Sequence, residues 1–424
     1  MSSAAPTERT PRAAGRLLLL SVFAIPFLAY LAGLHSVGSG DTRPAELLPI
    51  SILESGNLDF NEFVKPGEPL PYWFHRFGPR VVSIYPILPG ILNVPAYAAA
   101  RALGVPILER QELLSLLTAS AIAALSVLCV YLALLELKTT RAAAIRFAFA
   151  YAFGTCVWSV ASRGLWQHGP ATLFLSAGLW LVCRRNGKGA GWAGAAMALA
   201  VLCRPSALLL AAPLAAAFAW RRPGRLLRMA LGAAIPAALH VGYCAAYLGT
   251  PWSSGFWNPF PEVSNFSGKP LPGLAGLLVS PSRGLLVFSP FLLFAIPGIL
   301  RGLRSRDRRA LTIAMASGCA ATIGLYAFWT TWWAGHSFGY RFLIELTPFL
   351  TVLAAFWWEE SSRAGRTVFR ILLAWSVYVQ FLGAEIHPSG FNELLDKDPG
   401  VLWSLRDSEI AISTRKLIAR LAGF

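Results

Sequence analysis

Long apolar segments alternate with short basic segments along most of this chain. Many of the segments approach the roughly 20 residues that a helix needs to cross a bilayer. A soluble core cannot hide so many of them, so the pattern predicts an all-α polytopic membrane protein. The runs lie at 17–34, 112–137, 143–161, 167–184, 189–203, 205–220, 226–248, 285–300, 310–330, 340–358 and 367–385.

Basic residues precede the first run and then recur in alternate linkers. Lysine and arginine accumulate on the cytoplasmic side of membrane helices, so an even number of crossings should separate neighbouring clusters. This predicts about 11 crossings, a cytoplasmic N-terminus and an outer C-terminus. The clusters are Arg9, Arg12 and Arg16; Lys138 and Arg141; Arg184, Arg185 and Lys188; Arg221 to Arg228; Arg301 to Arg309; and Arg363 to Arg370.

A further apolar run at 81–104 does not fit this count. It carries Pro86, Pro89 and Pro95, and prolines break the hydrogen-bond ladder that a lipid-facing helix requires. We therefore predict helices that lie on, or dip into, the outer interface. In the alternative, 81–104 is a true span, and Lys138 and Arg141 lie outside.

Composition limits the function. The 424 residues are 55% hydrophobic and only 14% charged, with a mean hydropathy of +0.54. The net charge of +16 lies mostly in the short linkers, so it is expected to set topology and contact lipid headgroups rather than nucleic acid. The six cysteines form no CxxC pair, which indicates neither a disulfide framework nor a zinc site.

We expect one transmembrane domain, 1–385, with two large outer loops at 37–111 and 249–284. A short polar tail, 386–424, would lie on the same outer side. Aromatic residues in the second loop are expected to anchor it at the interface, or to stack on sugar rings: Trp252, Phe256, Trp257 and Phe260.

Asp41 is the leading candidate for chemistry, because it follows the first span directly and is predicted to face outward. Arg43 and Glu46 come next, so an acid, a base and a second acid gather where a helix leaves the membrane. Structural roles compete with this interpretation. Asp41 would also suit an N-cap for a helix starting near Pro44, and Arg43 with Glu46 would suit a helical ion pair.

Other polar residues are predicted at the same outer face. Each has a structural alternative as a loop or pairing residue, and for Arg341 the expected partner is Glu345 at i+4. An arginine inside a short membrane hairpin, as at Arg204, is costly and favours function. The candidate ligands of an anionic substrate are Arg163 and His168 in an outer turn, Arg204, Arg283 at a helix start, and His336 with Arg341 in one outer turn.

Several short segments resemble the GT-C glycosyltransferases that use polyprenyl-phosphate sugars, with a pattern related to protein mannosyltransferases and lipid A aminoarabinose transferases. The Asp41-x-Arg43 segment is similar to their first outer loop, and Tyr85-Pro86-Ile87-Leu88-Pro89 to a proline-rich interfacial segment whose adjacent prolines are missing here. The other matching segments are 162–168 (SRGLWQH), 203–206 (CRPS) and 333–343 (WAGHSFGYRFL).

The resemblance implies an inverting transfer of a hexosyl or pentosyl group from a polyprenyl-phosphate carrier to a glycan, lipid or protein acceptor. It implies Asp41 as the base, with the arginines as phosphate ligands. Composition favours a bacterial plasma (inner) membrane and a cell-envelope glycan. His75 and His336 match no metal motif, so no metal or cofactor is expected, although some GT-C oligosaccharide transferases use a divalent ion.

A transporter or flippase for a glycolipid is the main alternative, because broken helices and intramembrane arginines also occur in transporters. No inverted repeat is visible in the sequence, and the candidate residues gather on one predicted face. An enzyme predicts Asp41, Arg204 and Arg341 around one outward site. A transporter predicts a site near mid-membrane between two similar halves.

Overall fold

The computed structural model describes residues 12–65, 67–184, 189–249, 265–386 and 390–423, and 72% of these described residues are helical. The α-helices are α1 (Arg12–Leu31), α2 (Arg43–Ile50), α3 (Leu88–Ala102), α4 (Gln111–Glu136), α5 (Arg141–Gly154), α6 (His168–Cys183), α7 (Ala190–Cys203), α8 (Leu208–Ala219), α9 (Pro223–Tyr247), α10 (Pro270–Val279), α11 (Leu285–Phe288), α12 (Ala295–Arg304), α13 (Arg309–Ala327), α14 (Thr347–Trp358), α15 (Arg363–Phe381), α16 (Phe391–Lys397) and α17 (Glu409–Leu421).

Shorter helical segments and one hairpin connect them. Three are π-helices: η1 (Ser51–Ser55), η3 (Val157–Ala161) and η7 (Leu382–Ile386). Five are 3₁₀-helices: η2 (Asn61–Phe63), η4 (Pro205–Ala207), η5 (Pro290–Phe294), η6 (Arg341–Leu346) and η8 (Pro399–Trp403). Strands β1 (Phe74–Phe77) and β2 (Arg80–Ser83) pair antiparallel, with Phe74 opposite Ser83.

The helices have the lengths and composition of a membrane bundle. Five helical segments in the described part of the chain are long and apolar enough to cross a bilayer, and five shorter apolar helices accompany them. Helix α9 exposes leucines such as Leu227 and Leu239 along its length, which suits a lipid-facing helix and not a water-facing one. The predicted all-α polytopic membrane fold is confirmed, whereas the number of 11 crossings stays a prediction.

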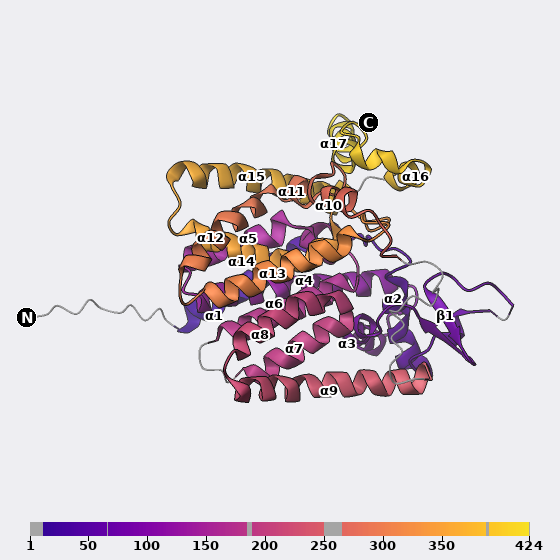
Figure 1. The fold of residues 1–424 in the computed structure, drawn as a ribbon. Coiled ribbons are helices and arrows are strands. Elements are labelled where there is room, and N and C mark those ends of the chain that lie inside the picture. The colour runs from indigo at the N-terminus through magenta and orange to yellow at the C-terminus, as the bar shows by residue number, and fades with distance from the viewer. Residues whose placement is uncertain (1–11, 66, 185–188, 250–264, 387–389, 424) are drawn as a thin grey trace, which may run out of the picture.

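The basic turns of the sequence meet at one end of the bundle. Arg308, before α13, donates to the carbonyl of Leu137 at the end of α4 and pairs with Glu359 after α14. The start of α1 lies beside the α4–α5 turn at Arg141. Figure 1 shows the α8–α9, α12–α13 and α14–α15 turns at this same end. This grouping is what the charge pattern requires if the basic linkers share one side of the membrane.

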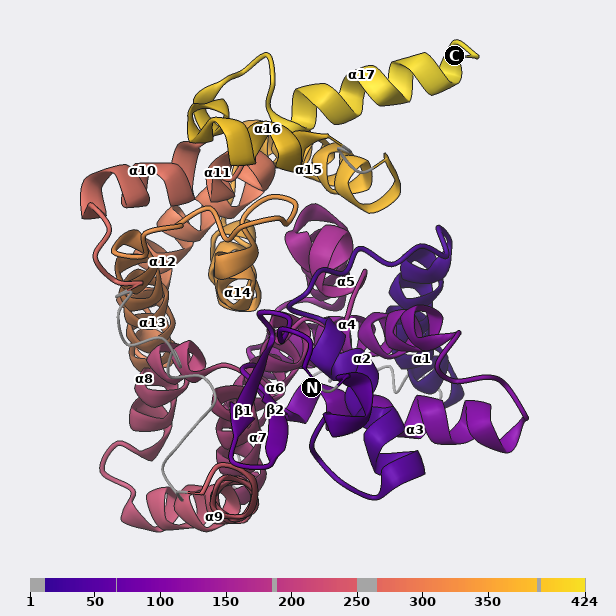
Figure 2. The same ribbon diagram turned by 90° about the vertical axis from the view of Figure 1, so that its right-hand side faces the viewer.

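The opposite end carries α2, the hairpin and α3, and we call it the strand end. Figure 2 views the molecule from this end, with these elements in front of the bundle. The run at 81–104, predicted to lie at the interface, forms β2 and the 15-residue helix α3, which is not among the candidate spans. The predicted run at 285–300 is divided among α11, η5 and α12, because Pro290 lacks an amide donor and starts a 3₁₀ turn.

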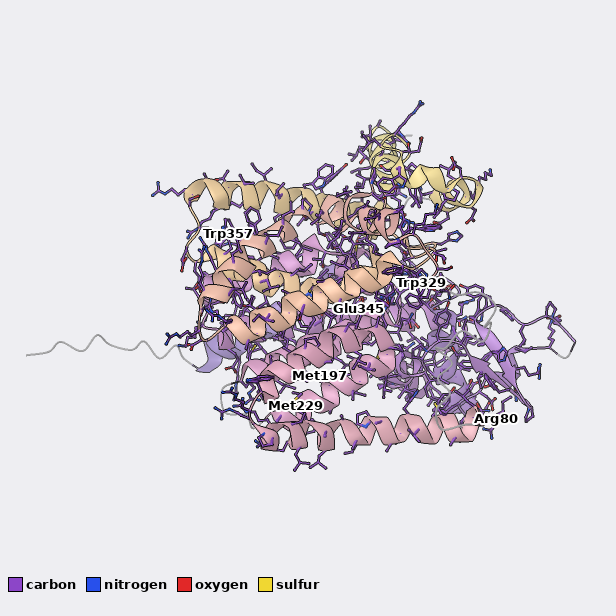
Figure 3. The ribbon with its side chains drawn as sticks, viewed as in Figure 1. Arg80, Met197, Met229, Trp329, Glu345 and Trp357 are labelled. Atoms are coloured by element: carbon purple, nitrogen blue, oxygen red, sulfur yellow. The ribbon has the colours of Figure 1, made fainter. Side chains whose placement is uncertain are left out.

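Among the five candidate spans of the described residues, the continuous segment formed by η6 and α14 is the most buried. Its window from Arg341 to Trp358 is 89% buried, whereas the window of α9 is only 17% buried. Figure 3 shows Glu345 of η6 inside the bundle, while Arg80 lies at the strand end. A polar residue at such a depth needs partners from neighbouring helices, and these partners form part of the site below.

The polar tail packs against the same end of the bundle as two helices, α16 and α17 (Figure 1). Ser280, at the end of α10, donates to the carbonyl of Leu402 at 2.7 Å, which ties the tail to the bundle. Some residues named from the sequence lie outside the described part of the chain: Arg9, Arg185, Lys188, Trp252, Phe256, Trp257 and Phe260.

Candidate active site

Asp41 lies in the turn between α1 and α2 at the strand end. Thr42 occupies the N-cap position of α2 and Asp41 does not cap it, so the structural alternative for Asp41 is not realised. One carboxylate oxygen, Oδ1, accepts hydrogen bonds from the hydroxyls of Tyr72 at 2.8 Å and Tyr85 at 2.7 Å. The other, Oδ2, accepts from Nη1 of Arg341 at 2.8 Å. The carboxylate is therefore held at a fixed position by three donors.

The surroundings of Asp41 control its protonation. Burial acts to raise the pKa of this carboxyl, but the charge of Arg341 and the hydrogen bonds from Tyr85, Tyr72 and Arg341 together outweigh burial and hold the pKa below its ordinary value. Burial and the negative charge of Asp41 raise the pKa of both tyrosines, which therefore stay protonated as donors. At neutral pH the carboxylate is ionised, and it is a weak proton acceptor while Arg341 stays on it.

Arg341 begins η6 and reaches back to the turn before it. Its Nη2 donates to the carbonyl of Ala334 at 2.7 Å, and its guanidinium lies 4.4 Å from the ring centre of Trp166. Its Nε is buried and has no hydrogen-bond partner among the residues that the structure describes. A buried cationic donor normally has a partner, because leaving it unpaired is costly.

A second buried cluster lies one turn further along the same segment, at Glu345. Its Oε1 is 2.9 Å from Nδ1 of His168 and 3.1 Å from Nε of Arg204. Because Nη1 of Arg204 donates to Nε2 of His168 at 2.8 Å, the imidazole carries its proton on Nδ1 and donates it to Glu345. Arg204 also donates to the hydroxyl of Tyr326. All four side chains are buried, so the charges satisfy one another inside the bundle.

The structure therefore brings Asp41 together with Arg341, and His168 with Arg204. The predicted pair of Arg341 with Glu345 does not form; each residue has a partner from a distant segment. The η6 segment joins Arg204 to the Asp41 site, because it carries both Glu345 and Arg341.

The other predicted ligands form separate pairs. Arg43 pairs with Glu46 at 2.8 Å, as the helical alternative predicts. The remaining pairs are Arg163 with Glu385, Arg283 with Glu409, and His336 with Asp396 at 2.7 Å. Arg163 keeps Nε and Nη1 buried without a partner in the described residues, while His336 is largely exposed.

Sequence reasoning named Glu345 only as a helical partner of Arg341, and it did not name Glu385, Glu409 or the tyrosines Tyr72 and Tyr326. Glu345 carried a usable signal, because an acid within an apolar membrane segment is expensive unless a cation pairs with it. Glu385, at the end of the apolar run 367–385, carried the same signal, whereas Tyr72 and Glu409 carried none, since they lie in polar segments whose position in space depends on the fold.

An apolar cavity of about 180 Å³ opens beside the Asp41 site. Its walls come from the segment before and into α3, from α7 and from α9; the lining residues include Tyr85, Ile87, Leu202 and Tyr243. Tyr85 belongs to both places, since its ring lines the cavity and its hydroxyl contacts Asp41. The cavity thus lies between the lipid-facing helix α9 and Tyr85, whose hydroxyl contacts the carboxylate.

No group of three or more histidine, cysteine, aspartate or glutamate side chains converges within the described residues. His75 lies on β1, and His336 pairs with Asp396 rather than with Asp41. The expectation that the protein uses no resident metal stays a prediction.

No family model matches the chain, and a search of curated proteins finds no match. Solved structures do match. ArnT from Cupriavidus metallidurans bound to undecaprenyl phosphate superposes with a TM-score of 0.58 at 16% identity, covering 97% of this chain and 79% of that one. The apo state of the same protein gives a TM-score of 0.56. The apo oligosaccharyltransferase from Archaeoglobus fulgidus gives 0.51 at 14% identity, covering 88% of this chain and 56% of that one.

These similarities concern the fold. Both neighbours are GT-C glycosyltransferases, so the chain has the GT-C fold that its motifs predict.

Proposed function

We propose that the protein is an inverting glycosyltransferase of the GT-C type. It would move a sugar from a polyprenyl-phosphate carrier to an acceptor hydroxyl at the outer face of the membrane. The observation that supports this most directly is the contact between Asp41 and Arg341, because a carboxylate is able to act as a base and an arginine is able to bind a phosphate. Arginine suits a phosphate better than lysine because its planar fork donates two parallel hydrogen bonds.

In the proposed reaction, the acceptor oxygen attacks the anomeric carbon from the face opposite the phosphate. The bond from the anomeric carbon to the phosphate oxygen breaks, and its electron pair stays on the phosphate. The acceptor proton passes to Asp41, and Arg341 stabilises the charge that grows on the leaving group. The products are the glycosylated acceptor, with inverted anomeric configuration, and the free polyprenyl phosphate.

The apolar cavity suits the lipid part of such a donor. It is lined by residues such as Ile87 and Leu202, and Tyr85 connects it to Asp41. Because the cavity is smaller than most ligand pockets, it would hold only the chain segment next to the phosphate, with the rest of the chain in the bilayer beside α9. A carrier in this position brings its phosphate to Arg341.

The occupied and empty sites should differ in the basicity of Asp41. In the empty site, Arg341 donates to Asp41 and lowers its pKa. A donor phosphate that draws Arg341 to itself would remove that contact, and its own negative charge would raise the pKa of Asp41 further. The base would then become effective only when the donor is in place, which protects the donor from premature reaction.

The test is sugar transfer from radiolabelled undecaprenyl-phosphate sugars in membranes that contain the wild-type protein or Asp41→Asn at matched expression. Asp307→Asn is a control with the same chemical change, because Asp307 is exposed in the α12–α13 turn at the opposite end of the bundle. A lost general base lowers the rate by about 10²- to 10⁴-fold, so transfer by Asp41→Asn should fall that far while donor binding persists.

Transfer that survives Asp41→Asn would remove this residue as the base and point to Glu46 or Asp59. A wild-type protein that transfers no sugar but moves the donor lipid across the bilayer would identify a flippase and overturn the proposal.

A further inference from the structure

The C-terminal tail reaches the active site through one buried ion pair. Helix α17 begins after the N-cap residue Ser408, so Glu409 lies in its first turn. Glu409 is 1% exposed, pairs with Arg283, and accepts a hydrogen bond from the backbone amide of Gly339 at 2.9 Å. Gly339 lies two residues before Arg341, so the tail touches the turn that presents this arginine.

Arg283 extends the connection into the same turn. It is 1% exposed, its Nε donates to the carbonyl of Trp333 at 3.0 Å, and its Nη2 donates to the carbonyl of Gly335 at 3.3 Å. These carbonyls lie on either side of Ala334. The carbonyl of Ala334 in turn accepts from Nη2 of Arg341 at 2.7 Å. Arg283 therefore fixes the backbone on both sides of Ala334, whose carbonyl binds the guanidinium of Arg341.

The turn needs such support because its backbone is strained. Ala334 has a φ of 63° and is a non-glycine residue in the left-handed region, which is an unfavourable conformation for a residue with a Cβ. A strained residue persists only when its surroundings determine its conformation. Without the two hydrogen bonds from Arg283, Ala334 is expected to relax, and its carbonyl would turn away from Arg341.

From these contacts we propose that Glu409 and Arg283 are positioning residues for Arg341, which makes the C-terminal tail a part of the active site. The proposal rests on the function proposed above, in which Arg341 holds the donor phosphate. Glu409 fixes Arg283, Arg283 fixes the turn around Ala334, and the turn fixes Arg341 against Asp41. No atom of the tail need touch the substrate.

The test compares Glu409→Gln with Glu393→Gln in the full-length protein. Glu393 is an exposed residue of α16, so the control makes the same chemical change in the same tail. With donor and acceptor varied separately, Glu409→Gln should raise the donor KM by about 10- to 100-fold, since a displacement of about 1 Å can cost that much. The acceptor KM and the anomeric outcome should stay as in the wild type.

Two further variants separate positioning from stability. Ala334→Gly adopts the left-handed conformation without strain, so it should recover part of the donor KM when combined with Glu409→Gln. If Glu409→Gln does not accumulate, Glu409→Asp is measured in its place. It keeps a charge beside Arg283 but withdraws the carboxylate from Gly339, and it should raise the donor KM by a smaller factor.

The outcomes are distinct. If the wild-type protein transfers no sugar, the proposed function fails. If it transfers sugar and Glu409→Gln retains the donor KM of Glu393→Gln, the positioning role fails while the function stands. The positioning role is also overturned if Glu409→Gln only lowers the amount of folded protein, leaves the donor KM and the acceptor KM unchanged, and is not improved by Ala334→Gly.

Discussion

Arg341→Gln tests the site at its central contact. The change removes the cation that lies 2.8 Å from Asp41 and, in the proposed reaction, binds the donor phosphate. A hydrogen bond to a charged group contributes about 1.5–3 kcal/mol, which corresponds to a donor KM raised by about 10- to 150-fold. Glutamine keeps a side-chain amide donor at this position, so the turn itself should survive. Arg341→Lys is the companion variant. It keeps a charge but loses the planar fork, so its donor KM should lie between those of the wild type and Arg341→Gln.

Arg341→Gln should also change the pH dependence of activity. Asp41 must be ionised to act as base, so activity is lost as the pH falls through its pKa. In the wild type, Arg341 and the tyrosines hold that pKa below its ordinary value. Arg341→Gln removes the largest contribution that lowers it, while burial still raises it. The acidic limb of kcat/KM should therefore move to higher pH in Arg341→Gln.

The assay is transfer from an undecaprenyl-phosphate sugar by purified protein in detergent, with kcat and donor KM measured across the pH range. A donor KM within twofold of the wild type would refute the role of Arg341 as a phosphate ligand. An acidic limb that stays in place or moves to lower pH would refute the account of Asp41.

Three further outcomes are expected. Arg204→Gln leaves Glu345 charged and buried without its arginine, so it should cost about 3–5 kcal/mol and lower the melting temperature measured in detergent. Gly298→Ala should prevent normal packing, because a Cβ there would lie 1.8 Å from a backbone oxygen of α14; the control Gly324→Ala meets open space and should be as stable as the wild type. The acidic limb of kcat, measured at saturating donor, should lie at higher pH than the acidic limb of kcat/KM, because the bound phosphate draws Arg341 away from Asp41. The pH profiles of kcat and kcat/KM check this.

Local sequence determined most of the helices. An apolar run between basic linkers has few alternatives to a membrane helix, since every backbone group must be satisfied within the segment. Predicted runs such as 112–137 and 310–330 therefore agree closely with α4 and α13. The segments that resemble GT-C enzymes depend on a few residues in order along the chain, so the fold could also be predicted from the sequence.

Only the tertiary structure decided which charges meet. Asp41 and Arg341 are 300 residues apart, and Arg163 and Glu385 are 222 apart. Any of several acids has the right chemistry for any of these arginines, and a one-dimensional pattern does not distinguish among them. Sequence spacing favoured Arg341 with Glu345, yet the bundle aims these two side chains at different neighbours.

The β1–β2 hairpin is another feature that local sequence did not predict. Strands β1 and β2 lie in a polar loop without a strong alternating pattern, and Tyr72, just before β1, reaches Asp41 only because the hairpin folds over the end of the bundle. The sequence by itself determined that this chain crosses a membrane and that an acid stands where the first helix ends. The packing of distant segments decided which cation and which tyrosines hold that acid, because burial makes unpaired charges costly and the fold alone brings their partners within reach.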